Sequence, residues 1–255
     1  MFCKICGDHC IFVHEAKILA KHLVKYYRCP KCYFLQTEEP FWLEEAYQKS
    51  INISDTGYMS RNIYLSRISS VLIYLFFNRK ARFIDYGGGY GVFVRLMRDI
   101  GFDFYWQDLY TQNLFARGFE AEEGRYELLT SFETFEHFDQ PDQEIRNMLE
   151  YSDNILFSTE LYGSDVPLVD WHYYGLDHGQ HISFYNIKTL QFIARKYSLN
   201  LWSNGKSLHV LMKRKVNPFL ISTVCCAERF GLSAFVKKMM DSRTLSDWKM
   251  LRNSG

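Results

Sequence analysis

The stretch Ala81–Phe93, ARFIDYGGGYGVF, constrains the fold of this 255-residue chain more than any other segment. It reads as a hydrophobic strand from Arg82 to Tyr86, then a turn with four glycines in five positions, then the start of a helix. Glycine accepts positive φ and lets a ligand approach the backbone closely. Because the first amides of a helix face such a turn, this arrangement predicts a docking place for a nucleotide-like cofactor.

The acid at the end of the strand separates this turn from the dinucleotide fingerprint. The order here is Asp85-x-Gly87-x-Gly89-x-Gly91, whereas a dinucleotide site has G-x-G-x-x-G. A carboxylate suits a cationic sulfonium with an amino-acid tail better than a pyrophosphate. The pattern resembles the first motif of class I S-adenosylmethionine (SAM)-dependent methyltransferases, (D/E)-x-G-x-G-x-G. The resemblance implies that these four residues bind SAM; a purely structural glycine turn is the alternative.

A second acid follows at the end of the next predicted strand, FDFYWQD. Asp108 lies about 20 residues beyond the glycines, where a carboxylate can accept hydrogen bonds from ribose hydroxyls. The family pattern gives it that role, and a helix N-cap is the alternative. An NAD enzyme would need the same acid, but Asp85 favours SAM.

The chain divides into four predicted segments. Residues 1–36 carry two cysteine pairs and predict a zinc ribbon. Residues 37–80 predict a helical linker, residues 81–213 a SAM-binding Rossmann-like domain, and residues 214–255 an amphipathic helical tail.

Strand-like and helix-like patterns alternate within residues 81–213. The predicted strands are 82–86, 102–107, 118–121, 126–132, 154–159, 199–203 and 207–213. The predicted helices are 92–100, 111–116, 143–151 and 187–197. Asn204-Gly205 is a hairpin turn that joins the last two strands. We therefore expect an α/β fold with a mostly parallel seven-stranded sheet, helices on both faces, and a closing antiparallel hairpin, as in the resembled family.

The segment Ser131–Pro141, SFETFEHFDQP, follows a strand end and carries an E-x-x-E-H pattern. It resembles the segment of SAM O-methyltransferases of ubiquinone biosynthesis and of small-RNA 2′-O-methyltransferases, in which two Glu and His bind a divalent metal. A later His completes that site, which nominates His181. The resemblance implies a divalent metal, in addition to the zinc of the ribbon, at Glu133, Glu136, His137 and His181. Carboxylate and imidazole ligands of this kind can bind Mg²⁺ or Mn²⁺.

Two other roles for this cluster remain open. Without a metal, His137 or His181 could act as the general base, because imidazole titrates near neutral pH. In related enzymes not known to need a metal, the same residues contact the cofactor or shape the pocket. We assign Glu133 to cofactor binding, and Glu136, His137 and His181 to catalysis.

An insert rich in aromatic and His side chains, Val166–Tyr185, follows the strand predicted to end at Thr159. It could cover a substrate or simply pack as a loop. Residues 84–211 most resemble bacterial methyltransferases that modify sugars and surface glycans. That resemblance implies methyl transfer to a hydroxyl of a glycan precursor or a related small metabolite.

The pairs Cys3-x-x-Cys6 and Cys29-x-x-Cys32 have the spacing of a four-thiolate zinc site. Four protein ligands leave no open position, so the zinc would be structural; a redox dithiol is the alternative. Paired thiols of this kind fit a reducing compartment. With no basic start followed by an apolar run, and no apolar stretch near ~20 residues, we expect a cytoplasmic protein.

Charge does not favour nucleic acid as a partner, since the net charge is only +1. Residues 213–255 are locally basic, and their apolar run breaks at Gly231. We expect this tail to dock on its own domain; an anionic membrane surface or a partner subunit are alternatives. Two other functions stay open: a zinc- and SAM-binding scaffold without catalysis, and an RNA methyltransferase with the ribbon as reader.

Overall fold

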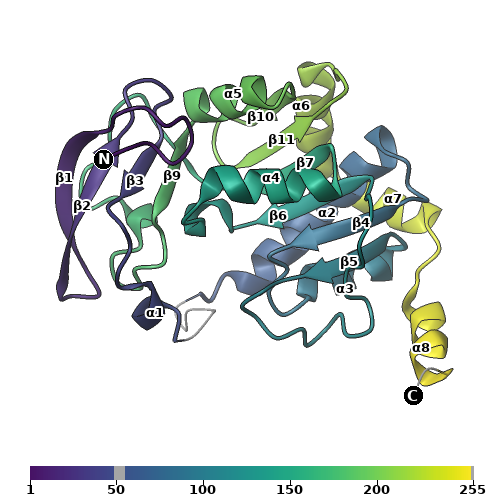
Figure 1. Ribbon diagram of the computed structural model, residues 1–255. Helices are drawn as coiled ribbons and strands as arrows, with labels where there is room; N and C mark the ends of the chain where they lie inside the picture. Colours follow the sequence, from purple (N-terminus) through teal and green to yellow (C-terminus); the bar gives the residue numbers. More distant parts are fainter. Residues whose placement is uncertain (49–54, 254–255) are drawn as a thin grey trace. The chain divides into compact units, whose positions relative to one another are not determined.

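The computed structural model describes residues 1–48 and 55–253 (Figure 1). Residues 49–54 of the predicted linker and 254–255 of the predicted tail lie outside the described residues. The chain divides into two compact units, each assembled from several stretches. The first unit contains 1–52, 132–149 and 156–214, and the second contains 53–131, 150–155 and 215–255. The four continuous segments expected from the sequence remain a prediction.

A six-stranded sheet follows the order β10-β11-β7-β6-β4-β5. Its strands are β4 (Arg82–Tyr86), β5 (Asp103–Gln107), β6 (Leu128–Phe132), β7 (Asn154–Ser158), β10 (Asn200–Ser203) and β11 (Leu208–Met212). β4 pairs in parallel with β5 and with β6, and β10 pairs antiparallel with β11. The predicted α/β, Rossmann-like core with a closing hairpin is therefore confirmed.

The predicted number of seven strands is wrong. Around residues 118–121 the described chain forms only an isolated parallel bridge between Trp106 and Glu120. Gly118 has φ +83, and its amide donates to the side chain of Glu120 at 3.0 Å instead of to a neighbouring strand. This local turn ends the pairing after one bridge.

The helix predicted over 111–116 is also wrong. The amides of Leu114 and Phe115 donate to the Tyr90 carbonyl at 3.1 and 2.9 Å, and the amide of Ala116 donates to the Asn113 side chain at 2.9 Å. The amides that a helix over 111–116 would pair internally thus have other acceptors, and the segment folds as bends and turns.

Helices account for much of the remaining chain. They are α1 (Leu43–Ala46), α2 (Tyr58–Phe76), α3 (Val92–Ile100), α4 (Pro141–Tyr151), α5 (Ile187–Lys196), α6 (Pro218–Ala227), α7 (Leu232–Met239) and α8 (Thr244–Asn253). Short 3-10 turns are η1 (Phe135–His137), η2 (His172–Tyr174) and η3 (Glu228–Phe230). α3 has the predicted bounds, and it begins after Gly91 because that residue adopts φ +83.

A second, five-stranded sheet lies in the first unit, in the order β1-β2-β3-β9-β8 (Figure 1). Its strands are β1 (Ile11–Ile18), β2 (His22–Arg28), β3 (Leu35–Thr37), β8 (Leu161–Tyr162) and β9 (Ser183–Asn186). β3 pairs with β9 through Leu35–Phe184 and Gln36–Ser183. The strands that lie between and beside the cysteine pairs therefore continue into strands from a segment more than 100 residues later.

Aromatic rings from the predicted insert form much of the core beneath this sheet. The Tyr174 ring lies 4.9 Å from that of Tyr26 and 5.0 Å from that of Phe184. All three are fully buried, with Trp42 close to that state. This part of the insert is a packing element, as the packed-loop interpretation expected.

In the second unit, a buried ion pair fixes α8 to α3. The guanidinium of Arg98 donates two bonds of 2.8 Å to the Asp247 carboxylate, and Arg95 adds a third of 2.9 Å. Arg98 and Asp247 are both buried. The last described helix is thus attached by a bidentate pair of good geometry.

Candidate active site

The glycine turn between β4 and α3 is held by the end of β5. The amides of Gly87 and Gly88 both donate to the Gln107 carbonyl, at 2.8 and 3.0 Å. The Gly89 amide donates to Oδ2 of Asp108 at 2.9 Å. Position 89 needs glycine, because its φ of +52 is left-handed and would strain a residue with a side chain. The sequence motif and the second acid, predicted separately, therefore form one structure.

Asp85 lies beneath this turn, at the end of β4, and is 3% exposed. Thr130 on the neighbouring strand donates its hydroxyl to Oδ1 of Asp85 at 2.6 Å. Burial raises the pKa of Asp85 to about 7, helped by the negative charge of Asp108, while the Thr130 bond opposes the rise. A buried acid of this kind is typical of a functional site rather than of a structural turn.

Asp108 makes three hydrogen bonds to backbone amides. Oδ1 accepts from Tyr110 and Thr111, and Oδ2 accepts from Gly89. A carboxylate offers about four acceptor positions, so one remains for a ligand hydroxyl. Asp108 both organises the turn and keeps the capacity for the predicted ribose contact.

Two aromatic residues of this site were missed by sequence reasoning. The Trp106 indole donates to the Gly89 carbonyl at 2.8 Å, and the Tyr58 hydroxyl accepts from the Tyr90 amide at 3.3 Å. A Cβ added at Gly89 would lie 2.9 Å from the Tyr58 oxygen. Tyr58 comes from α2, far from the motif in sequence, and no spacing marks it.

The Glu and His candidates meet in the first unit. Ile182 donates its amide to the Glu136 carbonyl at 2.9 Å, and Tyr185 donates its hydroxyl to the Phe135 carbonyl at 3.1 Å. These bonds attach η1 to the segment that enters β9. As a result, His181 comes beside the Glu136–His137 pair, as the resemblance implied.

Glu136 is the most unusual side chain of the cluster. It is 1% exposed, and neither of its carboxylate oxygens has a hydrogen-bond partner among the described residues. Burial raises its pKa to about 8, and the nearby charge of Glu133 adds to the rise, while the neighbouring Tyr173 and Thr159 side chains oppose it. A buried carboxylate without partners is costly, and such groups are commonly kept for a ligand, an ion or a proton.

The two imidazoles are held through Nδ1. Nδ1 of His181 lies 2.7 Å from the Tyr173 carbonyl, and a carbonyl only accepts, so this Nδ1 carries the proton and Nε2 is the basic nitrogen. Nδ1 of His137 lies 2.9 Å from the Tyr47 hydroxyl, which can donate or accept, and 3.1 Å from the Gln180 carbonyl. Burial lowers the pKa of His137 to about 4 and that of His181 well below its ordinary value, so both rings stay neutral.

This geometry fits a metal. One ligand atom from each of Glu136, His137 and His181 can be chosen so that all lie within 4.8 Å of one another. Nδ1–H bonds to backbone carbonyls are the usual way of orienting metal-binding imidazoles. Glu133 does not belong to this group: it has φ +53, and its carboxylate accepts from the Ser158 hydroxyl at 2.5 Å.

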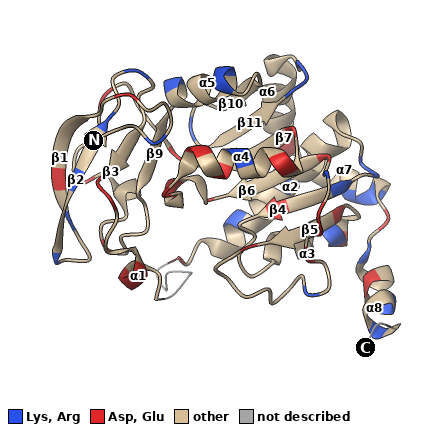
Figure 2. Cartoon of the chain, viewed as in Figure 1, with Lys and Arg blue, Asp and Glu red and all other residues tan. Residues whose placement is uncertain are grey.

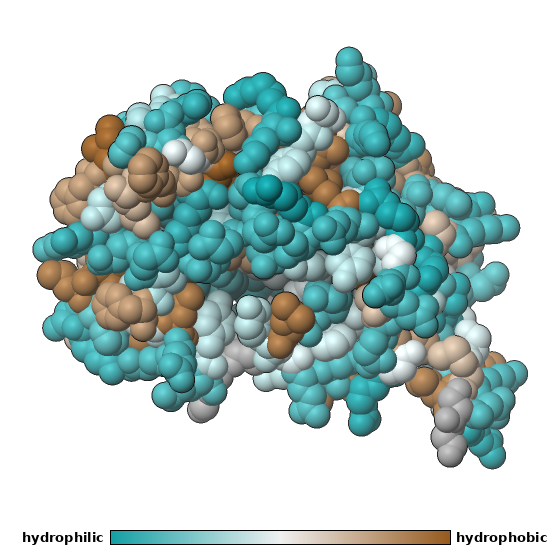
Figure 3. Space-filling view, in the orientation of Figure 1, coloured by the Kyte–Doolittle hydropathy of each residue, from teal (hydrophilic) through white to brown (hydrophobic). Residues whose placement is uncertain are grey.

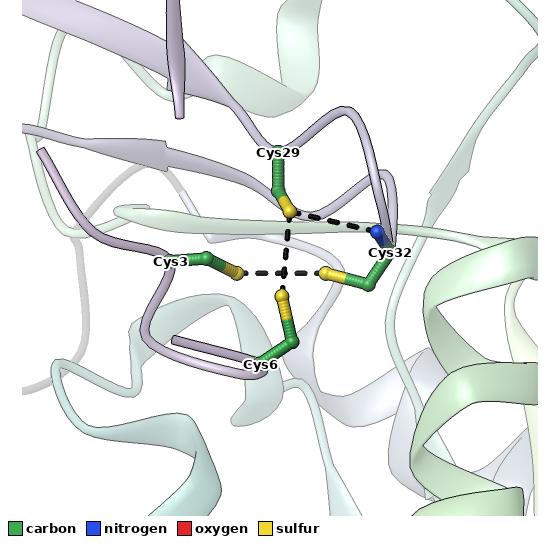
Figure 4. A group of neighbouring side chains, drawn as sticks. All are labelled: Cys3, Cys6, Cys29 and Cys32. Atoms are coloured by element: carbon green, nitrogen blue, oxygen red, sulfur yellow. Dashed lines mark hydrogen bonds between the residues drawn. The ribbon is translucent and has the colours of Figure 1, made fainter. Parts of the chain in front are cut away.

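The four cysteines of the two predicted pairs converge in the first unit (Figure 4). The Sγ atoms of Cys3 and Cys32 lie 3.5 Å apart, and those of Cys6 and Cys29 lie 3.4 Å apart. Figure 4 shows the two pairs crossing, with all four sulfurs directed at one centre. Four converging thiols are the donor set of a structural zinc site.

The chain belongs to the methyltransferase-domain family, whose model matches residues 60–204, more than half of the sequence. This match covers the glycine turn, both acids and the Glu–His cluster. Together they define a SAM-dependent methyltransferase. No curated protein matches the chain.

Solved methyltransferases are similar to parts of this chain at low identity. A possible histamine N-methyltransferase from Thermotoga maritima has a TM-score of 0.48 and 10% identity, covering 68% of this chain and 100% of that one. The 1,6-didemethyltoxoflavin-N1-methyltransferase of Burkholderia thailandensis, with S-adenosylhomocysteine (SAH) bound, has a TM-score of 0.47 and 13% identity, covering 80% and 100%. A methyltransferase of calicheamicin biosynthesis has a TM-score of 0.42 and 11% identity. That match covers 67% of this chain and 61% of the calicheamicin enzyme.

Proposed function

We propose that this methyltransferase transfers a methyl group from SAM to a hydroxyl of a small metabolite, with a sugar or glycan precursor as the preferred class. The observation that carries the proposal is the buried Glu136 carboxylate beside the neutral imidazoles of His137 and His181. An alcohol is poorly acidic, so its methylation needs a site that removes the hydroxyl proton or stabilises the negative oxygen that its loss leaves.

Glu136, His137 and His181 would hold a divalent metal in this proposal. Bound there, the metal would lower the pKa of a coordinated hydroxyl. The residues themselves would orient the acceptor. A ring nitrogen that binds the metal cannot also take a proton, so His137 or His181 would act as the general base only in a site without metal. Their low pKa values keep them unprotonated across the neutral range.

Asp85, Gly87 and Gly89 would bind the methionine end of SAM, and Gly91 would open the helix that faces it. Asp108 would accept from the ribose. Transfer then depends mostly on holding the acceptor oxygen in line with the methyl group.

The cysteine cluster would bind structural zinc. Lys196, at the end of α5, connects the loop of Cys3 and Cys6 to α4. It donates to the Ile5 carbonyl at 3.0 Å and to the Asp142 carboxylate. Lys4, next to Cys3, donates to Asp139 at 2.6 Å. Zinc would therefore order residues that pack on α4 and α5 within the same unit.

A labelled-methyl assay tests the proposal. Purified protein is given methyl-labelled SAM and Mg²⁺ or Mn²⁺, with nucleotide sugars, free glycosides or an RNA oligonucleotide as acceptors. We expect label on a sugar hydroxyl, and a loss of about 100-fold or more in Glu136→Gln. The exposed Glu123→Gln is the matched control and should keep full activity.

Binding of SAH is measured on the same variants to distinguish an effect on the cofactor site from an effect on the acceptor site. Glu136→Gln should bind SAH as the natural protein does, because the residue is assigned to the acceptor. Label on RNA alone, or full activity in Glu136→Gln, would contradict the proposal.

A further inference from the structure

The charge of the chain is divided unevenly. Residues 213–255 contain nine Lys and Arg against three Asp and Glu, which leaves 21 basic and 26 acidic residues in the rest of the chain. Of the three acids, Asp247 is neutralised by Arg95 and Arg98. Figure 2 shows basic residues on α7 and α8. The near-zero net charge therefore conceals a strongly basic C-terminal segment on an otherwise acidic protein.

The helices of this segment are attached to the second unit by one face only. α2 packs against α6, η3 and α7, and the buried contacts of the tail include Ile221 on α6 and Val236 on α7. The expected docking on the chain's own domain is thus present. It covers only a narrow strip of each helix.

The other faces remain apolar and exposed. Phe230 is 92% exposed and Phe219 is 74% exposed, and Leu220, Phe235 and Met239 are exposed as well. On α6 the residues Phe219 and Cys226 lie at helical spacing on the side opposite Ile221. Large apolar side chains exposed together on neighbouring helices, opposite the faces that pack on α2, indicate a surface for a further apolar environment.

Basic residues border these side chains. Arg229 precedes Phe230, Lys237 and Lys238 lie between Phe235 and Met239, and all three basic side chains are exposed. Lysine is depleted in protein–protein interfaces. At a lipid surface it is favoured, because it binds anionic headgroups while its methylene chain lies along apolar groups.

The helices are too short to cross a bilayer singly. Among the described residues no single helix is long and apolar enough to do so, and Pro218–Phe230 with Leu232–Met239 meets that test only as a pair bent by 90°. A bent pair with exposed Phe and flanking Lys and Arg is suited to lie in the interface instead.

We propose that α6, η3 and α7 form a surface that binds anionic lipid membranes, with Phe219, Phe230, Phe235 and Met239 inserted among the acyl chains and Arg229, Lys237 and Lys238 on the headgroups. This surface would hold the enzyme at the membrane, independently of the acceptor it methylates.

Vesicle sedimentation of the full chain tests this surface. The vesicles are phosphatidylcholine alone, or phosphatidylcholine with an equal amount of phosphatidylglycerol. We expect binding to the second kind only, weakening as salt is raised. Phe219→Ser with Phe230→Ser should lower the affinity at least about tenfold per residue. Lys237→Ala with Lys238→Ala should lower it about 25-fold.

Matched controls come from other surfaces. Phe12 is an exposed residue of β1 in the first unit, so Phe12→Ser should bind normally. Figure 3 shows hydrophobic residues gathered over the region of β1 and β2. Lys17→Ala with Lys206→Ala removes two exposed lysines elsewhere and should also bind normally.

Thermal melts establish that each variant is folded. Equal binding to both vesicle kinds, no binding at all, or unchanged binding after the two Phe changes would overturn the proposal. A stable dimer in sedimentation velocity that Phe219→Ser abolishes would instead assign the surface to a second copy of the chain.

Discussion

Asp85 combines two properties that are normally in conflict, a charge-bearing side chain and nearly complete burial. Its single strong donor is the Thr130 hydroxyl, which does not offset the loss of water. A cationic amino group from SAM would supply the missing compensation. The residue therefore lowers the stability of the unliganded protein in favour of binding.

Replacing Asp85 by Asn should change how the free energy of unfolding depends on pH. Between about pH 4 and pH 7 the native protein keeps a proton on Asp85 that the unfolded chain has lost, so this residue makes stability fall as pH rises through that window. Asp85→Asn removes the effect. Its free energy of unfolding should exceed that of the natural protein by up to about 4 kcal/mol above pH 7, and by little near pH 4.

Urea unfolding at several pH values measures this difference. Asp153→Asn is the control, since the Asp153 side chain is about half exposed and pairs with Arg125 at 2.8 Å. If the free energies of unfolding of Asp85→Asn and the natural protein differed by the same amount at every pH, Asp85 would be charged throughout the pH range, and the prediction would be wrong.

Single residues were predictable where a local pattern carried them. Asp85 lies at the end of a strand, and Asp108, Glu136 and His137 each follow one. His181 needed the family resemblance, because hydrogen bonds formed on folding, such as the one from Ile182 to Glu136, bring it to the cluster. Tyr58 and Trp106 were not predictable, since their partners reach them only through folding.

At the scale of elements, strands with continuous apolar patterns were predicted to within a few residues, as was α3. The errors lie at 111–116 and 118–121, where the Tyr90 carbonyl and the side chains of Asn113 and Glu120 accept from backbone amides. Local side-chain bonds of this kind compete with helix and sheet, and the apolar pattern does not record them.

The cysteine loops make an element-scale prediction. Purified protein should contain one zinc per chain, and Cys29→Ser should lose it, because three thiolates and a hydroxyl bind zinc more weakly. Elemental analysis of both proteins gives the ratio. Cys226→Ser, which changes an exposed thiol on α6, should keep its zinc. A metal-free natural protein that melts normally would contradict the structural zinc site.

At the scale of the molecule, the five-stranded sheet was the least predictable feature. β9 and β8 join strands near the N-terminus across a long stretch of chain, and nothing local signals which strands pair. The six-stranded sheet was accessible because strand and helix alternate along the sequence and the rules of parallel sheets then limit the topology.

The measurement that tests the central claim most directly is a calorimetric titration with SAH. The natural protein should bind with a dissociation constant near ~1 μM, about −8 kcal/mol, and Asp85→Ala should lose this binding while Glu136→Gln retains it. Failure of the folded natural protein to bind SAH, or equally tight binding by Asp85→Ala, would contradict the assignment of Asp85 and the glycine turn to the cofactor.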